Sequence, residues 1–294
     1  MTGFLRSSDF CRGVQDLLAG TPAQREIFAG NRAIGRIALS VAAGADGSRR
    51  QRVHEEGALR VRFPNVAGRD AREAVVLNTA GGMAGGDHFD LDIAVGPDAK
   101  LTVTTAAAEK IYRSLGPGTE IRVKLDIGSG GTLGWLPQET ILFDQIRLRR
   151  SIEADLASNA SLLLAEGVVF GRSAMGETLA HGHFLDRWRV RRAGVLVFAE
   201  SLRLDGAIAD RLTRRAVAGG AVAIASVLKV PGDEAAVAAV RAKEKDFAGE
   251  VGVSTWNGLA LARLVAPDGA ALHRDLIAVL TAFGNMPLPR LWLN

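Results

Sequence analysis

Residues 91–105 read Leu91-Asp-Ile-Ala-Val-Gly-Pro-Asp-Ala-Lys-Leu101-Thr-Val-Thr-Thr105, an alternating strand, a turn and a second alternating strand. The same plan returns in residues 123–136, 152–165 and, more loosely, 188–198. Period-2 alternation of apolar residues, with Gly, Pro, Asn and Asp at the turns, is typical of β-strands. We therefore interpret the middle of the chain as repeated β units.

A leucine after each turn aligns the four copies. Leu101, Leu133, Leu162 and Leu196 are separated by 32, 29 and 34 residues. Periods of this size indicate supersecondary units that stack because each is too small to bury its own apolar face. The predicted fold class is mainly β, a helical stack of β-strand repeats with two α-helices in the C-terminal part.

A glycine-rich loop precedes the first copy. Residues 78–87 read Asn-Thr-Ala-Gly-Gly-Met-Ala-Gly-Gly-Asp87, with a strand-like run before them and the first repeat strand after them. Paired glycines permit positive φ and close backbone approach, so we expect tight packing here, with Asp87 at a fixed corner. The glycine spacing differs from that of phosphate-binding loops, and a strand rather than a helix follows.

A glutamate follows the second strand of three copies, at Glu139, Glu166 and Glu200, and Glu109 takes a later position in the first copy. Stacking in register would line these carboxylates along one wall. Each adjoins apolar residues, and a buried carboxylate needs a partner, a proton or a metal. Pairing with arginine is the simpler interpretation, because the chain has 30 Arg against 6 Lys. Both interpretations stay open at this point.

Composition bounds the class of protein. The 294 residues carry a net charge of +4 and a single cysteine, Cys11, so an internal disulfide and a cysteine-rich metal site are excluded. Residues 1–20 lack the apolar core of a signal peptide and no apolar run reaches 18 residues, so we expect a cytoplasmic protein without membrane spans. The densest basic run, Arg147-Leu-Arg-Arg150, alternates like a solvated strand edge. Aromatic residues make up only 5% of the chain, which argues against nucleic-acid binding.

The chain divides into three predicted parts: an extension over residues 1–32, a β-repeat body over 33–206, and a C-terminal α+β segment, 207–294, packed on the body. The body should begin with strands at residues 33–41 and 58–63, joined by a polar connection over 43–56.

The C-terminal segment differs from the body in composition and in its predicted elements. Residues 211–229 are rich in Ala, Gly and Val, and we predict short strands there. Asp233 is the expected N-cap of a helix that reaches residue 247. A second helix is predicted over residues 270–283, with Leu272, Leu276 and Leu280 on one face.

Taken together, six ordered sequence blocks resemble the UreD family of urease accessory proteins, also called UreH, and the similarity covers residues 33–294. The blocks are the loop ending at Asp87, Thr104-Thr-Ala with Lys110-Ile-Tyr-Arg-Ser114, Trp135-Leu-Pro-Gln-Glu139, Glu166 with Gly171-Arg172 and Gly176-Glu177, Glu200-Ser-Leu-Arg-Leu204, and Pro289-Arg-Leu-Trp292.

The resemblance implies a β-rich helical stack with two helices, and a scaffold without catalytic residues. It implies binding to UreF, which joins the GTPase UreG, and docking onto the urease apoenzyme, with two copies in the accessory complex. It also implies a water-filled tunnel that conducts nickel transiently, in which Asp87, Glu166 and Glu200 correspond to the tunnel carboxylates. Weaker candidates for contacting the ion are His88, which follows Asp87 directly, and Glu109 and Glu139 of the repeat.

Nickel chemistry agrees with this implied role. Ni(II) accepts oxygen and imidazole ligands, and a conduit must bind weakly enough to release its ion. Isolated carboxylates along a wet wall would do so. The alternative, from a different class, is an enzyme that uses Asp87 and Glu166 as an acid–base pair.

Overall fold

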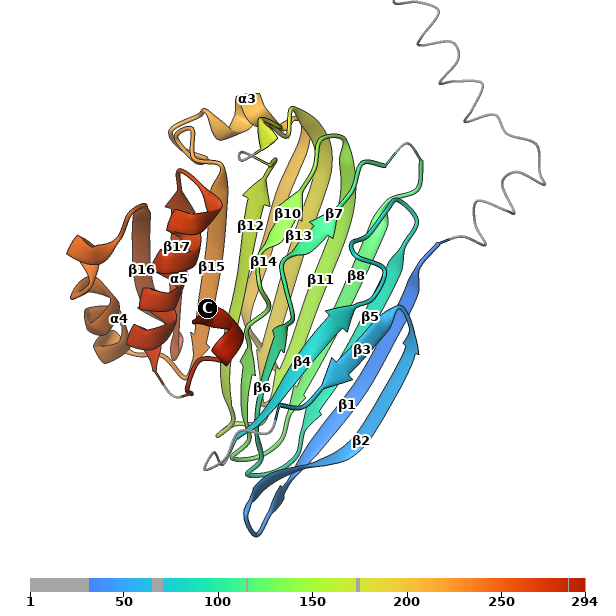
Figure 1. Ribbon diagram of the computed structural model, residues 1–294. Coiled ribbons are helices and arrows are strands. Elements are labelled where there is room, and N and C mark those ends of the chain that lie inside the picture. Colours follow the sequence, from blue (N-terminus) through green and yellow to red (C-terminus); the bar gives the residue numbers. More distant parts are fainter. Residues whose placement is uncertain (1–31, 65–70, 115, 173–174, 285, 294) are drawn as a thin grey trace, which may run out of the picture.

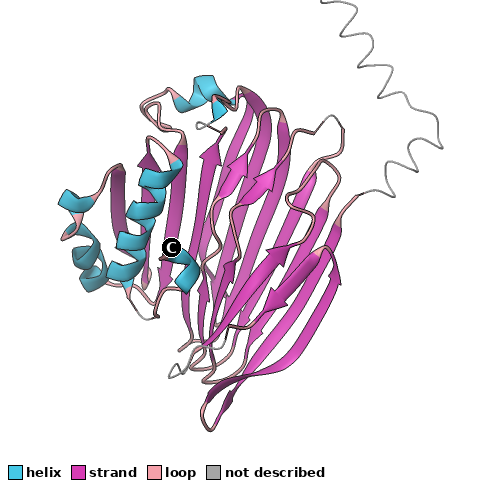
Figure 2. Ribbon diagram, viewed as in Figure 1, coloured by secondary structure: helices cyan, strands magenta, loops and turns pink. Residues whose placement is uncertain are grey.

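Two β-sheets face each other in the computed structural model, and helices cover the outside of one of them (Figure 1). The structure describes residues 32–64, 71–114, 116–172, 175–284 and 286–293. Within these residues strands predominate and the α-helices lie in the C-terminal part, which confirms the predicted fold class (Figure 2).

The first sheet contains seven strands. In spatial order they are β14 (Val195–Ala207), β13 (His181–Arg192), β11 (Ile146–Leu156), β8 (Thr119–Ile127), β5 (His88–Val95), β1 (Ile34–Gly44) and β2 (Gly47–Gly57).

The second sheet contains ten strands. Its main path runs β16 (Glu250–Trp256), β17 (Leu259–Ala266), β15 (Ala223–Val230), β12 (Ser161–Phe170), β9 (Thr132–Trp135), β6 (Lys100–Thr105), β4 (Arg72–Asn78) and β3 (Leu59–Arg62). Two short strands, β7 (Glu109–Ile111) and β10 (Thr140–Leu142), pair with each other, and β10 also pairs with β12.

The sequence repeat is visible in the strand register. Within each copy the chain runs through the first sheet and then the second, so β5, β8, β11 and β13 are parallel neighbours in one sheet. In the other sheet Leu101 pairs with Leu133, and Leu133 pairs with Leu162. The leucines that align the copies in sequence are therefore neighbours in space.

The fourth copy departs from this plan. Ala193 and Gly194 both have positive φ, and β14 turns back to pair antiparallel with β13 instead of crossing to the second sheet. Its place beside β12 is taken by β15, which runs antiparallel to β12. As a consequence Glu200 belongs to the first sheet and Glu166 to the second.

The polar connection expected over residues 43–56 is instead strand β2, which pairs with β1 at the edge of the first sheet. Most of its side chains are exposed, so its sequence lacks the apolar alternation that marks a half-buried strand. The predicted extension, residues 1–32, lies outside the described residues except for Arg32.

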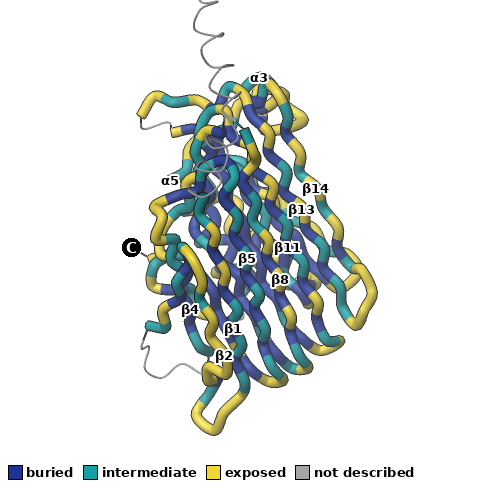
Figure 3. Tube along the Cα trace, turned by 90° about the vertical axis from the view of Figure 1, so that its right-hand side faces the viewer, coloured by how far each residue is buried: buried dark blue, intermediate teal, exposed yellow. Residues whose placement is uncertain are grey.

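The main core fills the space between the two sheets. Inward positions alternate with solvent-facing ones, as the burial pattern of β5 shows, and Figure 3 displays the resulting stripes on the first sheet. A second apolar cluster lies between the second sheet and helix α5, where Leu272, Leu276 and Leu280 are buried.

The two predicted helices are present. Helix α4 (Glu234–Arg241) begins after the N-cap Asp233 and is followed by a short 3-10 turn, η2 (Glu244–Asp246), while α5 spans Gly269–Phe283.

The prediction of short strands over residues 211–229 was wrong for the first half of that range, where the end of α3 (Ile208–Leu212) and turns precede β15. A last 3-10 turn, η3 (Arg290–Trp292), lies near the C-terminus. No helix in the described parts of the chain is long and apolar enough to span a membrane.

Candidate functional site

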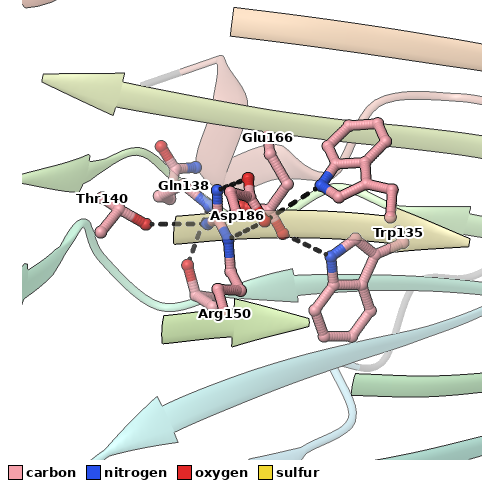
Figure 4. A network of polar contacts seen from close by, with 8 residues as sticks. Trp135, Gln138, Thr140, Arg150, Glu166 and Asp186 are labelled. Carbon is pink, nitrogen blue, oxygen red and sulfur yellow. Dashed lines mark hydrogen bonds and ion pairs between the residues drawn. The ribbon is translucent and has the colours of Figure 1, made fainter. Parts of the chain in front are cut away.

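A buried charge network lies between the two sheets (Figure 4). Arg150 of β11 donates from Nε and Nη2 to the two oxygens of Asp186 of β13, at 3.1 and 2.6 Å. Its Nη1 donates to Glu166 Oε2 of β12, across the gap between the sheets, and to Thr140 Oγ1 at 3.3 Å. Trp135 Nε1 donates to the other oxygen of Glu166 at 2.9 Å. Both oxygens of each carboxylate are thereby held by N–H donors.

The network is almost fully closed to solvent, since the side chains of Arg150 and Glu166 are 3% and 4% exposed. Burial raises the pKa of Glu166 to about 7, opposed by the Arg150 charge and the Trp135 hydrogen bond and reinforced by the Asp186 charge. For Arg150, burial favours the neutral form, but the two carboxylates outweigh it and raise its pKa. One guanidinium therefore serves two carboxylates, and with both ionised the network carries one uncompensated negative charge.

A cavity of about 20 Å³ adjoins the network and has room for about one water molecule. It is lined by Arg150, Glu166 and Asp186 together with Glu200, Ser226 and apolar side chains. Glu200 Oε1 accepts from Arg263 Nη1 at 2.7 Å. Its Oε2 is buried and has no hydrogen-bond partner among the described residues. The structure thus brings two of the predicted tunnel carboxylates, Glu166 and Glu200, to one small cavity.

Asp87 does not line this cavity. Its Oδ1 accepts from the Ala33 amide at 2.8 Å and its Oδ2 from the Ala84 amide at 2.7 Å, so it ties the glycine-rich loop to the start of β1. The loop is tightly packed, as predicted: a Cβ on Gly85 would clash with the Ser114 hydroxyl. The acid–base pair of the alternative interpretation, Asp87 and Glu166, therefore does not share the cavity.

Glu109 lies within electrostatic reach of Asp87. Asn78 Nδ2 donates to both of its oxygens, at 3.0 and 3.2 Å. Burial raises the pKa of Glu109, and the negative charge of Asp87 acts in the same direction. The structure thus places these two predicted residues near each other, apart from the cavity that Glu166 lines.

The remaining two candidates lie elsewhere. His88 is on the outer face of the first sheet, with Nε2 at 3.0 Å from Asp90 Oδ2 and Nδ1 at 3.5 Å from Glu120 Oε2. Glu139 Oε1 is 2.7 Å from Nδ1 of His273 in α5, on the helix side of the second sheet. The repeat therefore does not line Glu139 with Glu166 along one wall.

Two charged members of the network were missed in the sequence. The alternation of the run ending at Arg150 predicts a solvated strand edge. Arg147 and Arg149 are indeed exposed, but Arg150 points inward. The alternation along the strand indicates this orientation, because Arg150 lies two residues from the buried Leu148 and Ile152 and so shares their face. Asp186 is likewise in phase with buried neighbours in β13.

The arrangement offers single oxygen ligands rather than a closed metal site. In the described part of the chain, no three His, Cys, Asp or Glu side chains cluster closely enough to hold a metal ion together. A carboxyl group with a pKa near 7 can lose its proton to water when a metal cation binds in its place, and take a proton up again when the cation leaves.

Comparison with known proteins gives a consistent result. The family described as "UreD urease accessory protein" matches residues 33–293. A protein named urease accessory protein UreD from Rhodopseudomonas palustris (strain HaA2) is 55% identical, covering 92% of this chain and 97% of the relative. The protein of the same name from strain BisB18 is 56% identical over 91% of this chain and 96% of the relative. One from Bradyrhizobium diazoefficiens is 53% identical with the same coverage.

Proposed function

Because the chain belongs to the UreD family of urease accessory proteins, we propose that it is a non-catalytic scaffold that conducts nickel to the urease active site. Nickel is the cargo of this protein, held transiently and passed on. The proposal rests on the small cavity between the sheets, where carboxylates from both sheets meet among largely apolar side chains.

The cavity chemistry suits transfer rather than storage. Glu166 and Glu200 each offer oxygen atoms, and Glu200 Oε2 is a buried acceptor without a protein donor in the described residues. Oxygen ligands contributed singly bind Ni(II) more weakly than a closed His or Cys set, so the ion can leave again. Loss of the Glu166 proton to water as the ion approaches would offset part of the charge that the ion brings.

The proposed path continues toward the glycine-rich loop. Thr140, whose hydroxyl accepts from Arg150, pairs with Glu109 in the register of β10 and β7. Glu109 in turn lies within electrostatic reach of Asp87. The path therefore links Asp87 and Glu109 to Glu166 and Glu200. His88 and Glu139 lie off this line, and their part in transfer stays a prediction.

The proposed partners follow from the family. We propose that the chain binds UreF, joins UreG through UreF, and docks onto the urease apoenzyme in the cytoplasm, with two copies in the accessory complex. The names of the relatives support assembly with urease.

The proposal is tested with the double variant Glu166→Gln/Glu200→Gln, which removes both charges and keeps the side-chain shapes. Asp87 is left intact because it also holds the loop. The matched control is Glu234→Gln/Glu244→Gln, the same charge change at two exposed positions. Each version is co-expressed with urease and its other accessory proteins, and urease activity, nickel content and recovery of the complex are measured.

We expect the cavity variant to assemble normally but to leave urease with less nickel, and the control to match the wild type. Full nickel loading by the cavity variant would refute the conduit. The two glutamates would then have only a structural role, as ion-pair partners of arginine. Loss of the complex itself would instead point to a folding defect, to be checked by circular dichroism.

A further inference from the structure

Among the described residues, no helix lies over the outer face of the seven-stranded sheet (Figure 3). The described helices pack elsewhere: α4 and α5 contact β15, β16 and β17 of the other sheet, and α3 contacts the ends of β13 and β14. The outward side chains of β8, β11 and β13 are mostly charged, and arginine is the commonest among them.

A hollow of about 210 Å³ lies in the middle of this face. Four of its lining residues, Arg122, Arg149, Ser151 and Arg187, define what we call the arginine hollow. The register places Arg122, Ser151 and Arg187 in one row across β8, β11 and β13, and Arg149 lies two residues from Ser151 on β11. Three guanidinium groups thus surround one small hydroxyl side chain.

The charge of the hollow is only partly balanced within the chain. Arg122 pairs with Glu120 at 2.7 Å. Among the described residues, neither Arg149 nor Arg187 has a carboxylate within ion-pairing distance. Glu120, which also lines the hollow, lies opposite Arg149 in the register, so the lining holds three outward arginines against one glutamate. An anion entering the hollow would therefore meet a net positive charge. The hollow therefore favours a negatively charged ligand.

Two features of the face decide the class of ligand. Acidic residues such as Glu120 and Glu153 interrupt the arginines and would repel a continuous phosphate backbone. The outward positions of β8, β11 and β13 hold no Phe, Tyr or Trp on which a base could stack. A protein segment can place separate carboxylates at the arginines and avoid the acidic positions.

The spacing also fits an extended acidic segment. Rows on the sheet repeat every two residues, about 7 Å apart, and next-but-one strands are about 10 Å apart. Side chains at alternate positions of an extended peptide have the same spacing of about 7 Å. Guanidinium groups suit carboxylates because they donate two parallel hydrogen bonds.

We propose that the arginine hollow is a docking site for an acidic segment of a partner protein, whose carboxylates pair with Arg149 and Arg187. This site is separate from the interior cavity and does not depend on nickel transfer. It would add electrostatic steering and orientation to an assembly that other surfaces hold together.

The test measures binding of a fluorescent octaglutamate peptide to the full-length chain by anisotropy, at 50 and 300 mM salt. The variant Arg149→Gln/Arg187→Gln removes the two unbalanced charges. The control Arg36→Gln/Arg52→Gln makes the same change in net charge on the same face, outside the hollow. We expect about a tenfold weaker affinity for the hollow variant at low salt, and a near wild-type affinity for the control.

Two results would overturn the proposal. Equal loss in both variants would mean attraction to net charge alone, and no loss in the hollow variant would mean that the arginines do not bind carboxylates. Octauridylate and vesicles containing anionic lipid are measured in parallel. Tighter hollow-dependent binding of either one would assign the hollow to a nucleic acid or a membrane instead. Nickel loading of urease is not a readout here, so failure of the conduit leaves this result unaffected.

Discussion

Glu166→Gln should flatten the dependence of stability on pH. In the wild type, burial raises the pKa of Glu166 from an ordinary 4.5 to about 7. The folded chain therefore binds this proton more tightly than the unfolded chain does, and the stabilisation is complete below about pH 4.5 and lost as pH rises through 7. The difference in pKa, which already includes the opposing effects of Arg150 and Trp135, corresponds to roughly 3 kcal/mol.

The substitution removes the titrating group but not its neighbours. A glutamine amide can accept a hydrogen bond from only one of the two donors, Arg150 and Trp135. The variant should therefore be less stable than the wild type by about 1–3 kcal/mol at every pH at which the wild-type side chain accepts both hydrogen bonds. The informative quantity is therefore the change in unfolding free energy between pH 5 and pH 8, not its value at one pH.

The assay is urea unfolding at several pH values, followed by tryptophan fluorescence, with Glu234→Gln as an exposed control. We expect the wild type and the control to lose stability from pH 5 to pH 8 by up to about 3 kcal/mol more than Glu166→Gln does. Parallel curves for the wild type and Glu166→Gln would show that Glu166 is ionised throughout, and the reasoning about the shared guanidinium would be wrong.

Three further predictions concern packing and assembly. Gly85→Ala should lower the unfolding free energy, measured by urea unfolding, by about 1–3 kcal/mol because the new methyl group clashes with Ser114. The control Gly116→Ala should change it by no more than about 0.5 kcal/mol, because a Cβ at that position contacts no other atom. Trp292→Ala should lower the unfolding free energy by about 3–5 kcal/mol, because the indole is buried and donates hydrogen bonds to Leu136 and Thr104. The control Leu293→Ala truncates an exposed side chain and should change thermal unfolding little. The chain expressed alone should be only partly soluble, and co-expression with UreF should raise the soluble fraction. A fully soluble monomer without affinity for UreF in gel filtration would contradict the proposed partnership.

The stacking of the body could be predicted because it is local and periodic. Each copy carries the same alternation and turn residues, and equal spacing between leucines becomes equal register between parallel strands. The end of the stack could not be predicted in this way. The fourth copy has a similar strand pattern, but Ala193 and Gly194 form a tight turn that keeps β14 in the first sheet. A single turn decides which sheet receives Glu200.

The site was harder to predict because its members come from separate strands. Arg150, Glu166 and Asp186 are 16 to 36 residues apart, and only their inward phase relates them in sequence. Asp87 and Glu166 look alike in sequence, as carboxylates beside glycine and apolar residues. Their surroundings differ in the fold: backbone amides hold Asp87, whereas Glu166 competes with Asp186 for one guanidinium.

The guanidinium of Arg150 also sets a condition on the proposed nickel transfer. A cavity of about 20 Å³ admits one water molecule, whereas a hydrated divalent cation brings several. Arg150 repels the ion and already occupies Glu166, one of the two cavity carboxylates that the ion would use. Passage along the proposed path therefore requires Arg150 to give up Glu166, so that the ion binds there while Asp186 keeps the guanidinium through its two hydrogen bonds. Glu166 is the partner that can be released, because it is joined to Arg150 by one nitrogen rather than two and its pKa lies near neutrality. In this arrangement the ion pair that stabilises the wall would also close the proposed conduit.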